Sequence, residues 1–151
     1  MFQCSQENIH IDKIDYFCYI GWNKTQEKKM IQMDKKLSTS KITPDLIDYI
    51  VKKIVKEIDP EKIILFGSYA RGDYSKDSDL DLFIIKDGNH NSRLLRREID
   101  GLLWGREFSL DLFVRKPEEV EWNFRAKNPF YLHHIFKEGK ILYEKKKSRG
   151  N

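Results

Sequence analysis

Two short apolar segments joined by a glycine-containing turn constrain the fold most strongly. Residues 62–66 (KIILF) and 80–85 (LDLFII) consist mainly of isoleucine, leucine and phenylalanine. Apolar segments of this length are typical of buried strands and are short for helices. Gly67 ends the first segment, and Ser68 can cap a short helical turn through the letters YARG. The sequence therefore predicts two strands of one small sheet, connected through this turn.

The second strand carries two acidic residues where a buried strand would be apolar. One leucine separates Asp79 from Asp81, so the alternation of a strand places both carboxylates on the same face. Adjacent like charges repel each other, and removing each from water costs on the order of several kcal/mol if nothing compensates. A divalent cation provides that compensation, and carboxylate oxygens suit Mg²⁺ or Mn²⁺. We therefore predict that Asp79 and Asp81 bind one or two Mg²⁺ ions.

The turn ahead of these acids has the features of a phosphate-binding loop. Gly67 allows a phosphate to approach the backbone, and Ser68 offers its hydroxyl and nearby N–H groups to an anion. Arg71 lies one helical turn further on and can reach the same phosphate, although it can instead pair with Asp73 or Asp77. A strand, a phosphate-binding turn and a strand with two metal-binding acids together predict a nucleoside triphosphate site.

A third acid repeats the pattern of an aspartate between leucines in a strand. Asp111 lies in the segment 108–114 (FSLDLFV), which reads as another strand. If that strand neighbours the one carrying Asp79 and Asp81, all three carboxylates can face one cleft. Asp111 would then help to hold a second metal ion or act as a general base on the attacking hydroxyl. The residues expected to contact the nucleotide are Gly67, Ser68, Arg71 and Ser78.

The remaining pattern predicts helices and strands mixed around a small sheet. Thr43 is a good N-cap, Pro44 suits the first helical position, and Pro60 ends the helix between them. The expected helices cover residues 44–59, 92–104, 117–127 and 129–139, and the other expected strands cover 108–114 and 141–144. We therefore expect an α+β (mixed α/β) fold, with a small mixed sheet flanked by helices.

Several other conspicuous side chains are expected to have structural roles. Tyr69 is expected to pack rather than to take part in chemistry. His133 and His134 lack metal-ligand spacing to another histidine or cysteine, so helix packing is expected for both. The core or a partner surface is expected to contain the aromatic residues Trp104, Trp122 and Phe124.

The two ends of the chain differ in character from its middle. Residues 1–40 combine an aromatic stretch with a polar run and show no sustained periodicity. We interpret them as a family-specific extension or as the product of a start codon placed too early, because Met30 and Met33 directly precede the organised part. The alternative is an element that packs on the edge of the domain. Residues 41–144 then form the main domain, and 145–151 a basic tail.

Composition indicates a folded protein without a membrane segment. The chain has 151 residues, of which 40% are hydrophobic, and a net charge of +4. Its last eight residues hold four basic side chains against one acidic one, so the body is nearly neutral and a nucleic-acid partner is not expected. Cys4 and Cys18 form no metal-binding motif, and neither a secretory signal nor an apolar run of about 20 residues is present. These features predict a cytoplasmic protein.

The stretch 67–83 (GSYARGDYSKDSDLDLF) resembles a known signature. It matches the pattern G-S-x10-D-x-D of the nucleotidyltransferase superfamily that includes DNA polymerase β, with no departure. The short chain and the wording GSYARG…SDLDL resemble the minimal nucleotidyltransferase branch, over roughly residues 43–144. The resemblance implies a nucleotidyltransferase fold, with the triphosphate on Gly67 and Ser68. It implies Mg²⁺ on the acids Asp79, Asp81 and Asp111.

The same resemblance implies a partner and a reaction. Many members of the minimal branch are antitoxins that transfer AMP from ATP to a tyrosine of a HEPN-domain ribonuclease toxin. This chain has little room for a substrate domain, so we expect it to borrow its acceptor from a bound partner, as a homo- or hetero-oligomer. The aromatic, basic stretch 121–140 is a candidate docking surface, or else a packed helical pair. Two alternatives stay open: an enzyme that adenylylates an antibiotic, and an antitoxin that only binds its toxin.

Overall fold

The computed structural model describes residues 34–146, so most of the predicted extension lies outside the described residues. The chain divides into the units Met1–Met33 and Asp34–Asn151. Asp34 accepts a hydrogen bond from the hydroxyl of Tyr49 and another from the ammonium group of Lys53 at 2.7 Å. Leu37 is fully buried. The unit that contains the sheet therefore includes residues shortly ahead of 41.

The first described helix, α3 (Pro44–Ile58), begins where the sequence predicts. The hydroxyl of Thr43 accepts a hydrogen bond from the backbone N–H of Leu46 at 3.2 Å, which satisfies one free donor of the first turn. Asp59 adopts a left-handed conformation with a φ of 50° and ends the helix. One face of α3 is buried through Leu46, Ile50, Val51, Ile54 and Ile58.

The described strands form one mixed sheet in the order β3-β2-β1-β4. Strand β1 pairs antiparallel with both β2 and β4, whereas β2 and β3 are parallel. Parallel neighbours need a crossover connection, and α5 (Ser92–Leu102) supplies it. The strands are β1 (Lys62–Phe66), β2 (Leu80–Ile85), β3 (Leu110–Arg115) and β4 (Lys140–Glu144).

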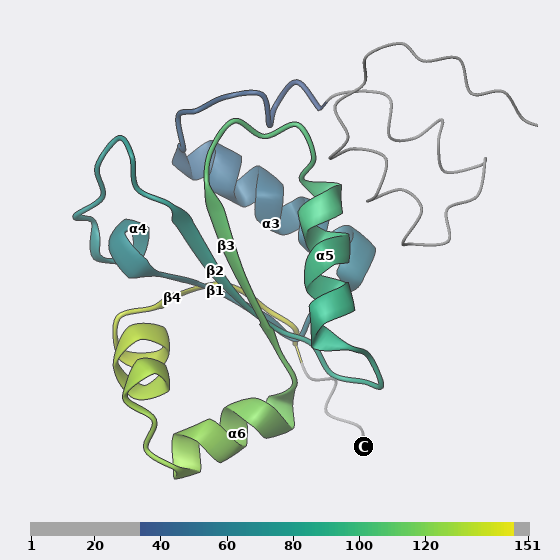
Figure 1. Cartoon of the computed structure of the whole chain (residues 1–151), viewed down its shortest axis with the longest axis vertical. Coiled ribbons are helices and arrows are strands. Elements are labelled where there is room, and N and C mark those ends of the chain that lie inside the picture. Colours follow the sequence, from purple (N-terminus) through teal and green to yellow (C-terminus); the bar gives the residue numbers. More distant parts are fainter. Residues whose placement is uncertain (1–33, 147–151) are drawn as a thin grey trace, which may run out of the picture. The chain divides into compact units, whose positions relative to one another are not determined.

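Helices cover both faces of this sheet. Figure 1 shows α3 and α5 together on one side of the sheet and α6 (Pro117–Arg125) on the other. A short helix, α4 (Gly67–Arg71), connects β1 to the loop before β2. The segment η2 (Phe130–Lys137) is wound as a π-helix and precedes β4. The mixed fold with a small sheet between helices is therefore confirmed.

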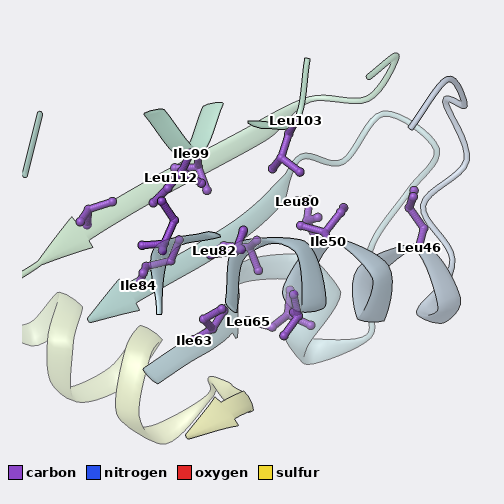
Figure 2. Packing of buried hydrophobic residues seen from close by; sticks show 14 of the residues in the cluster. Leu46, Ile50, Ile63, Leu65, Leu80, Leu82, Ile84, Ile99, Leu103 and Leu112 are labelled. Atoms are coloured by element: carbon purple, nitrogen blue, oxygen red, sulfur yellow. The ribbon is translucent and has the colours of Figure 1, made fainter. Parts of the chain in front are cut away.

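Strand alternation divides the buried side chains into two clusters. Figure 2 shows the larger one, in which leucines and isoleucines of three strands meet Leu46 and Ile50 of α3 and Ile99 and Leu103 near α5. The strand residues on this face include Ile63, Leu65, Leu80, Leu82, Ile84 and Leu112. This cluster fixes the position of β2 between β1 and β3.

The opposite face is covered by α6 and η2. Phe83 of β2 is fully buried there, and its ring meets that of Tyr131 edge-on with 5.6 Å between centroids. The cluster contains Ile64, Phe66, Phe83, Ile85, Val120, Tyr131 and Ile135. Asp81 shares the strand face of Phe83, because the two residues are two positions apart. The acidic residues therefore lie at the margin of the smaller cluster.

The structure corrects several sequence expectations. Ser68 does not cap α4: the N-cap is Phe66, no side-chain capping bond forms, and Ser68 lies inside the first turn because the helix already begins at Gly67. The aromatic residues Trp104, Trp122 and Phe124 are exposed, so the core half of that expectation is wrong. His133 and His134 are also exposed rather than packed inside.

Smaller differences concern the ends of elements. The helix expected over 92–104 ends at Leu102, and the strand expected from 108 begins at Leu110. In the described part of the chain, the helices fall short of what a bilayer span requires in length and apolar character.

Candidate active site

Two of the predicted site residues face each other across neighbouring strands. Asp81 of β2 and Asp111 of β3 are direct partners in the parallel register. Partner residues project to the same face of a sheet, so both carboxylates leave the sheet on the side covered by α6 and η2. Asp81 is half-buried and Asp111 is exposed. The pairing of β2 with β3 thus gathers negative charge at one point of the sheet.

Asp79 lies one position before β2 and is exposed. Its charge acts on Asp81, together with that of Asp111. Within residues 34–146, no three histidine, cysteine or acidic side chains already converge closely enough to chelate a metal ion. The charges of Asp79 and Asp111 therefore act on Asp81, although the three carboxylates do not lie close enough to chelate one metal ion.

The pKa of Asp81 reflects this crowding. Burial, followed by the negative charges of Asp111 and Asp79, raises the pKa of its carboxyl from 3.8 to about 6. The positive charge of Arg71 acts in the opposite direction and lowers it. A bound divalent cation would favour ionisation of this carboxyl, because its positive charge offsets the two neighbouring acids.

Gly67 brings the backbone of the turn against the same carboxyl. Its φ is +70°, a conformation that side chains other than glycine rarely adopt. A Cβ at this position would lie 2.2 Å from Oδ2 of Asp81. Neither the conformation nor the space admits another residue, so glycine is required for the turn to lie directly beside the acid.

Ser68 and Ser78 occupy different surroundings. Ser68 is half-buried in α4, and its carbonyl accepts a hydrogen bond from the N–H of Gly72 at 2.8 Å. The hydroxyl of Ser78 accepts one from the N–H of Ser75 at 2.8 Å, within the loop between α4 and β2. Ser68 thus belongs to the turn that contacts Asp81, whereas Ser78 stabilises the following loop and stands directly before Asp79.

Arg71 connects the turn to the C-terminal part of the domain. Its Nε donates to Oδ2 of Asp73 at 3.2 Å, which is the alternative pairing considered from the sequence. Its Nη1 lies 3.6 Å from Oε2 of Glu138, just beyond η2. The same Glu138 oxygen lies 3.2 Å from Nδ1 of His134. Arg71 is therefore shared between two carboxylates while its charge still acts on Asp81.

Sequence reasoning missed Glu138. The residue follows η2, and its N–H donates to the carbonyl of His133 at 3.0 Å. The adjacent Gly139 has no room for a side chain, because a Cβ there would lie 2.2 Å from the carbonyl oxygen of Ile135. A glycine after the helix was the only local signal, and it gave no indication that the preceding acid meets Arg71.

The chain is similar to several known proteins. Residues 45–148 match the family model described as "Polymerase beta, Nucleotidyltransferase". Two proteins of Methanocaldococcus jannaschii, each named "Putative protein adenylyltransferase", are similar to the chain. The first is 34% identical over 92 residues, which are 55% of this chain and 78% of that protein. The second is 45% identical over 42 residues, which are 24% of this chain and 42% of that protein.

Solved structures show weaker likenesses. A crystal structure titled as a putative nucleotidyltransferase from Sulfolobus solfataricus has a TM-score of 0.45 and 20% identity, covering 85% of this chain and 95% of its own. One titled "Crystal structure of the toxin-antitoxin with AMP-PNP" has a TM-score of 0.40 and 18% identity, covering 66% and 74%. Structural similarity at these TM-scores is too low to assign a family. The match over residues 45–148 is sufficient to do so, and the chain belongs to the polymerase beta nucleotidyltransferase family.

Proposed function

We propose that this nucleotidyltransferase transfers AMP from ATP to a tyrosine of a protein partner, a HEPN-domain toxin, in the cytoplasm. The observation that carries the proposal is the facing pair of Asp81 and Asp111 beside the backbone of Gly67. The protein acceptor is supported by the names of the two curated relatives. The toxin partner is supported by the resemblance to the minimal nucleotidyltransferase branch.

The donor set of the site fits Mg²⁺. Asp79, Asp81 and Asp111 offer carboxylate oxygens, the donors that this ion prefers. Binding of a cation would favour the ionised form of Asp81, whose pKa is raised by burial and by the neighbouring acids. When bound, the ion would neutralise charge on the phosphates and lower the pKa of the attacking hydroxyl.

The residues of the chain then have distinct tasks. Gly67 and Ser68 hold the phosphates, and the guanidinium of Arg71 supplies a positive charge to them. The exposed Asp111 accepts the proton of the tyrosine hydroxyl while the tyrosine oxygen bonds to the α-phosphorus. The bond between the α-phosphorus and the bridging oxygen breaks, and pyrophosphate leaves with that oxygen. The product is an AMP-tyrosine ester on the partner.

The test is transfer of AMP to the product of the neighbouring gene. Purified protein is incubated with Mg²⁺, ATP and that product, and each protein is analysed by intact mass. The expected result is a mass increase of one or more AMP units on the partner. Asp81→Asn should abolish this increase, because Asn provides no negative charge for a cation. Chelation with EDTA should have the same effect.

A matched variant separates loss of chemistry from loss of fold. Asp48→Asn changes an exposed aspartate of α3 whose partner is Lys52, so it should retain full transfer. Transfer of AMP only to an added antibiotic would contradict the protein acceptor. Tight partner binding without turnover would identify an antitoxin that acts by binding alone. Full transfer by Asp81→Asn would refute the assigned role of the acid pair.

A further inference from the structure

A cavity of about 290 Å³ lies between α5 and β3 and reaches the candidate active site. Ser92, Arg93 and Arg96 of α5 form one side of it, and the strand contributes residues from Asp111 to Arg115. Because β3 is the edge strand of the described sheet, the cavity lies at an open margin of the domain. Asp111 is thus shared between this cavity and the acid pair.

The side of the cavity formed by α5 carries exposed positive charge. Arg93 and Arg96 are three residues apart, so they lie on one helix face, and both are exposed. Within residues 34–146, neither forms an ion pair with a carboxylate, whereas Arg106 and Arg125 are each paired with one. Two exposed guanidinium groups at one cavity are suited to binding carboxylates.

The third arginine of the cavity has a different role. The Nε of Arg115 donates to the hydroxyl of Tyr131 at 3.3 Å, and its Nη1 donates to the carbonyl of Val114 at 2.8 Å. Arg115 is therefore fixed at the far end of β3 from Asp111. The exposed positive charge that a ligand could engage belongs to Arg93 and Arg96.

We propose that Arg93 and Arg96 dock an acidic segment of the protein acceptor and so deliver its tyrosine to Asp111. This inference rests on the proposed function, and it names the chemistry of the acceptor: carboxylates close in sequence to the target tyrosine. The arginines and Asp111 line the same cavity along the edge strand β3, so an extended segment held by the arginines on the α5 side can run past this edge to the acid that takes the proton. The positive charge of Arg93 and Arg96 favours carboxylates over a polycation at this wall of the cavity.

The direct test uses a defined probe in place of the unidentified partner. A fluorescein-labelled random copolymer of glutamate and tyrosine is titrated with the full chain, and binding is followed by fluorescence anisotropy at low and high salt. The double variant Arg93→Glu/Arg96→Glu should bind about tenfold or more weakly, because each reversal replaces attraction by repulsion. Binding by the wild-type chain should weaken as salt is raised.

A control of equal charge change distinguishes local docking from general electrostatics. Lys127→Glu/Lys137→Glu alters two exposed lysines near α6 and at the end of η2, on the other side of the sheet. This variant should bind the copolymer within about twofold of the wild-type affinity. Equal weakening in both variants, or no binding by the wild-type chain, would overturn the proposal. Binding of polyuridylate with the same dependence on Arg93 and Arg96, and tighter than the copolymer, would assign the cavity to nucleic acid instead.

Transfer of AMP separates this inference from the proposed function. With Mg²⁺ and ATP, the wild-type chain should label the glutamate–tyrosine copolymer, whereas a lysine–tyrosine copolymer should remain unlabelled. If the arginine-dependent binding is found but no protein or copolymer is labelled, the docking site stands and the adenylyltransferase proposal fails. If the toxin is labelled equally by wild type and Arg93→Glu/Arg96→Glu, the proposed function stands and the docking site fails.

Discussion

The backbone of Gly67 lies directly against the carboxyl of Asp81. A Cβ on Gly67 would come within 2.2 Å of Oδ2 and 3.0 Å of Cγ of that aspartate. The two residues stand at opposite ends of the motif, but Phe66, the neighbour of Gly67, pairs with Asp81 in the antiparallel register of β1 and β2. The turn and the acid therefore form one unit, and a change in either displaces the other.

Gly67→Ala should abolish nucleotidyl transfer and destabilise the fold. The added methyl group requires Asp81 to move, and alanine at a φ of +70° adds backbone strain of about 1–2 kcal/mol. We expect the free energy of unfolding to fall by about 2–3 kcal/mol in urea denaturation. Gly72→Ala is the matched control, because Gly72 has a φ of +87° but no atom within 4 Å of a built Cβ. Equal losses in both variants would show that strain, and not the contact with Asp81, is responsible.

Asp81 should make the stability of the domain depend on pH in a defined direction. Its pKa is about 6 in the folded protein and near 3.8 when unperturbed. Between these values the folded state retains a proton that the unfolded state has lost, so stability falls as pH rises through this window. Below it both states are protonated and the loss vanishes. Above it the ionised carboxyl destabilises the fold fully.

The variant Asp81→Asn tests this dependence without a metal ion. It removes the ionisable group, so it should be more stable than the wild type by about 1–2 kcal/mol near neutral pH, a value reduced for partial solvent exposure. The difference should shrink as pH falls to about 4. Thermal unfolding of both proteins across this range, in EDTA, measures it. A difference that is constant with pH would contradict the raised pKa.

Glu138 should restrain Arg71 and thereby weaken ATP binding. Its carboxylate lies 3.6 Å from Nη1 of Arg71 and competes with phosphate for that guanidinium. Glu138→Gln should lower the KM for ATP about twofold to threefold, with less than about 1 kcal/mol change in stability, since the pair is partly exposed. Arg71→Ala should raise the KM. In the Arg71→Ala background, Glu138→Gln should have no further effect, and a persisting effect would exclude the coupling.

Leu37 should stabilise the domain although it lies ahead of the predicted boundary. It is fully buried in the larger core cluster, so Leu37→Ala should lower the free energy of unfolding by about 2–4 kcal/mol. Leu94→Ala provides the same chemical change at a side chain that is 50% exposed, and it should cost under about 1 kcal/mol. Similar losses in the two variants would show that residues near 37 do not belong to the folded unit.

Local pattern predicted much of the fold. The ends of α3, β1 and β2 follow from an N-cap, a proline, a glycine and short apolar runs, which act within a few residues of themselves. Alternation likewise predicted that Asp81 and the leucines beside it occupy opposite faces. The π-helical winding of η2 and the exposure of Trp122 could not be predicted, because both depend on what the segment packs against.

The sequence by itself determined the strand, the turn and the face of the sheet on which Asp81 lies, because glycine conformation and strand alternation are local properties. The tertiary structure decided which acids meet. Asp111 stands opposite Asp81 only because β3 pairs parallel to β2 in that register, after the crossover through α5. Arg71 meets Glu138 only because η2 returns across the sheet. Such contacts join segments far apart in the chain, and their geometry is set by the packing of both cores rather than by any neighbouring residue.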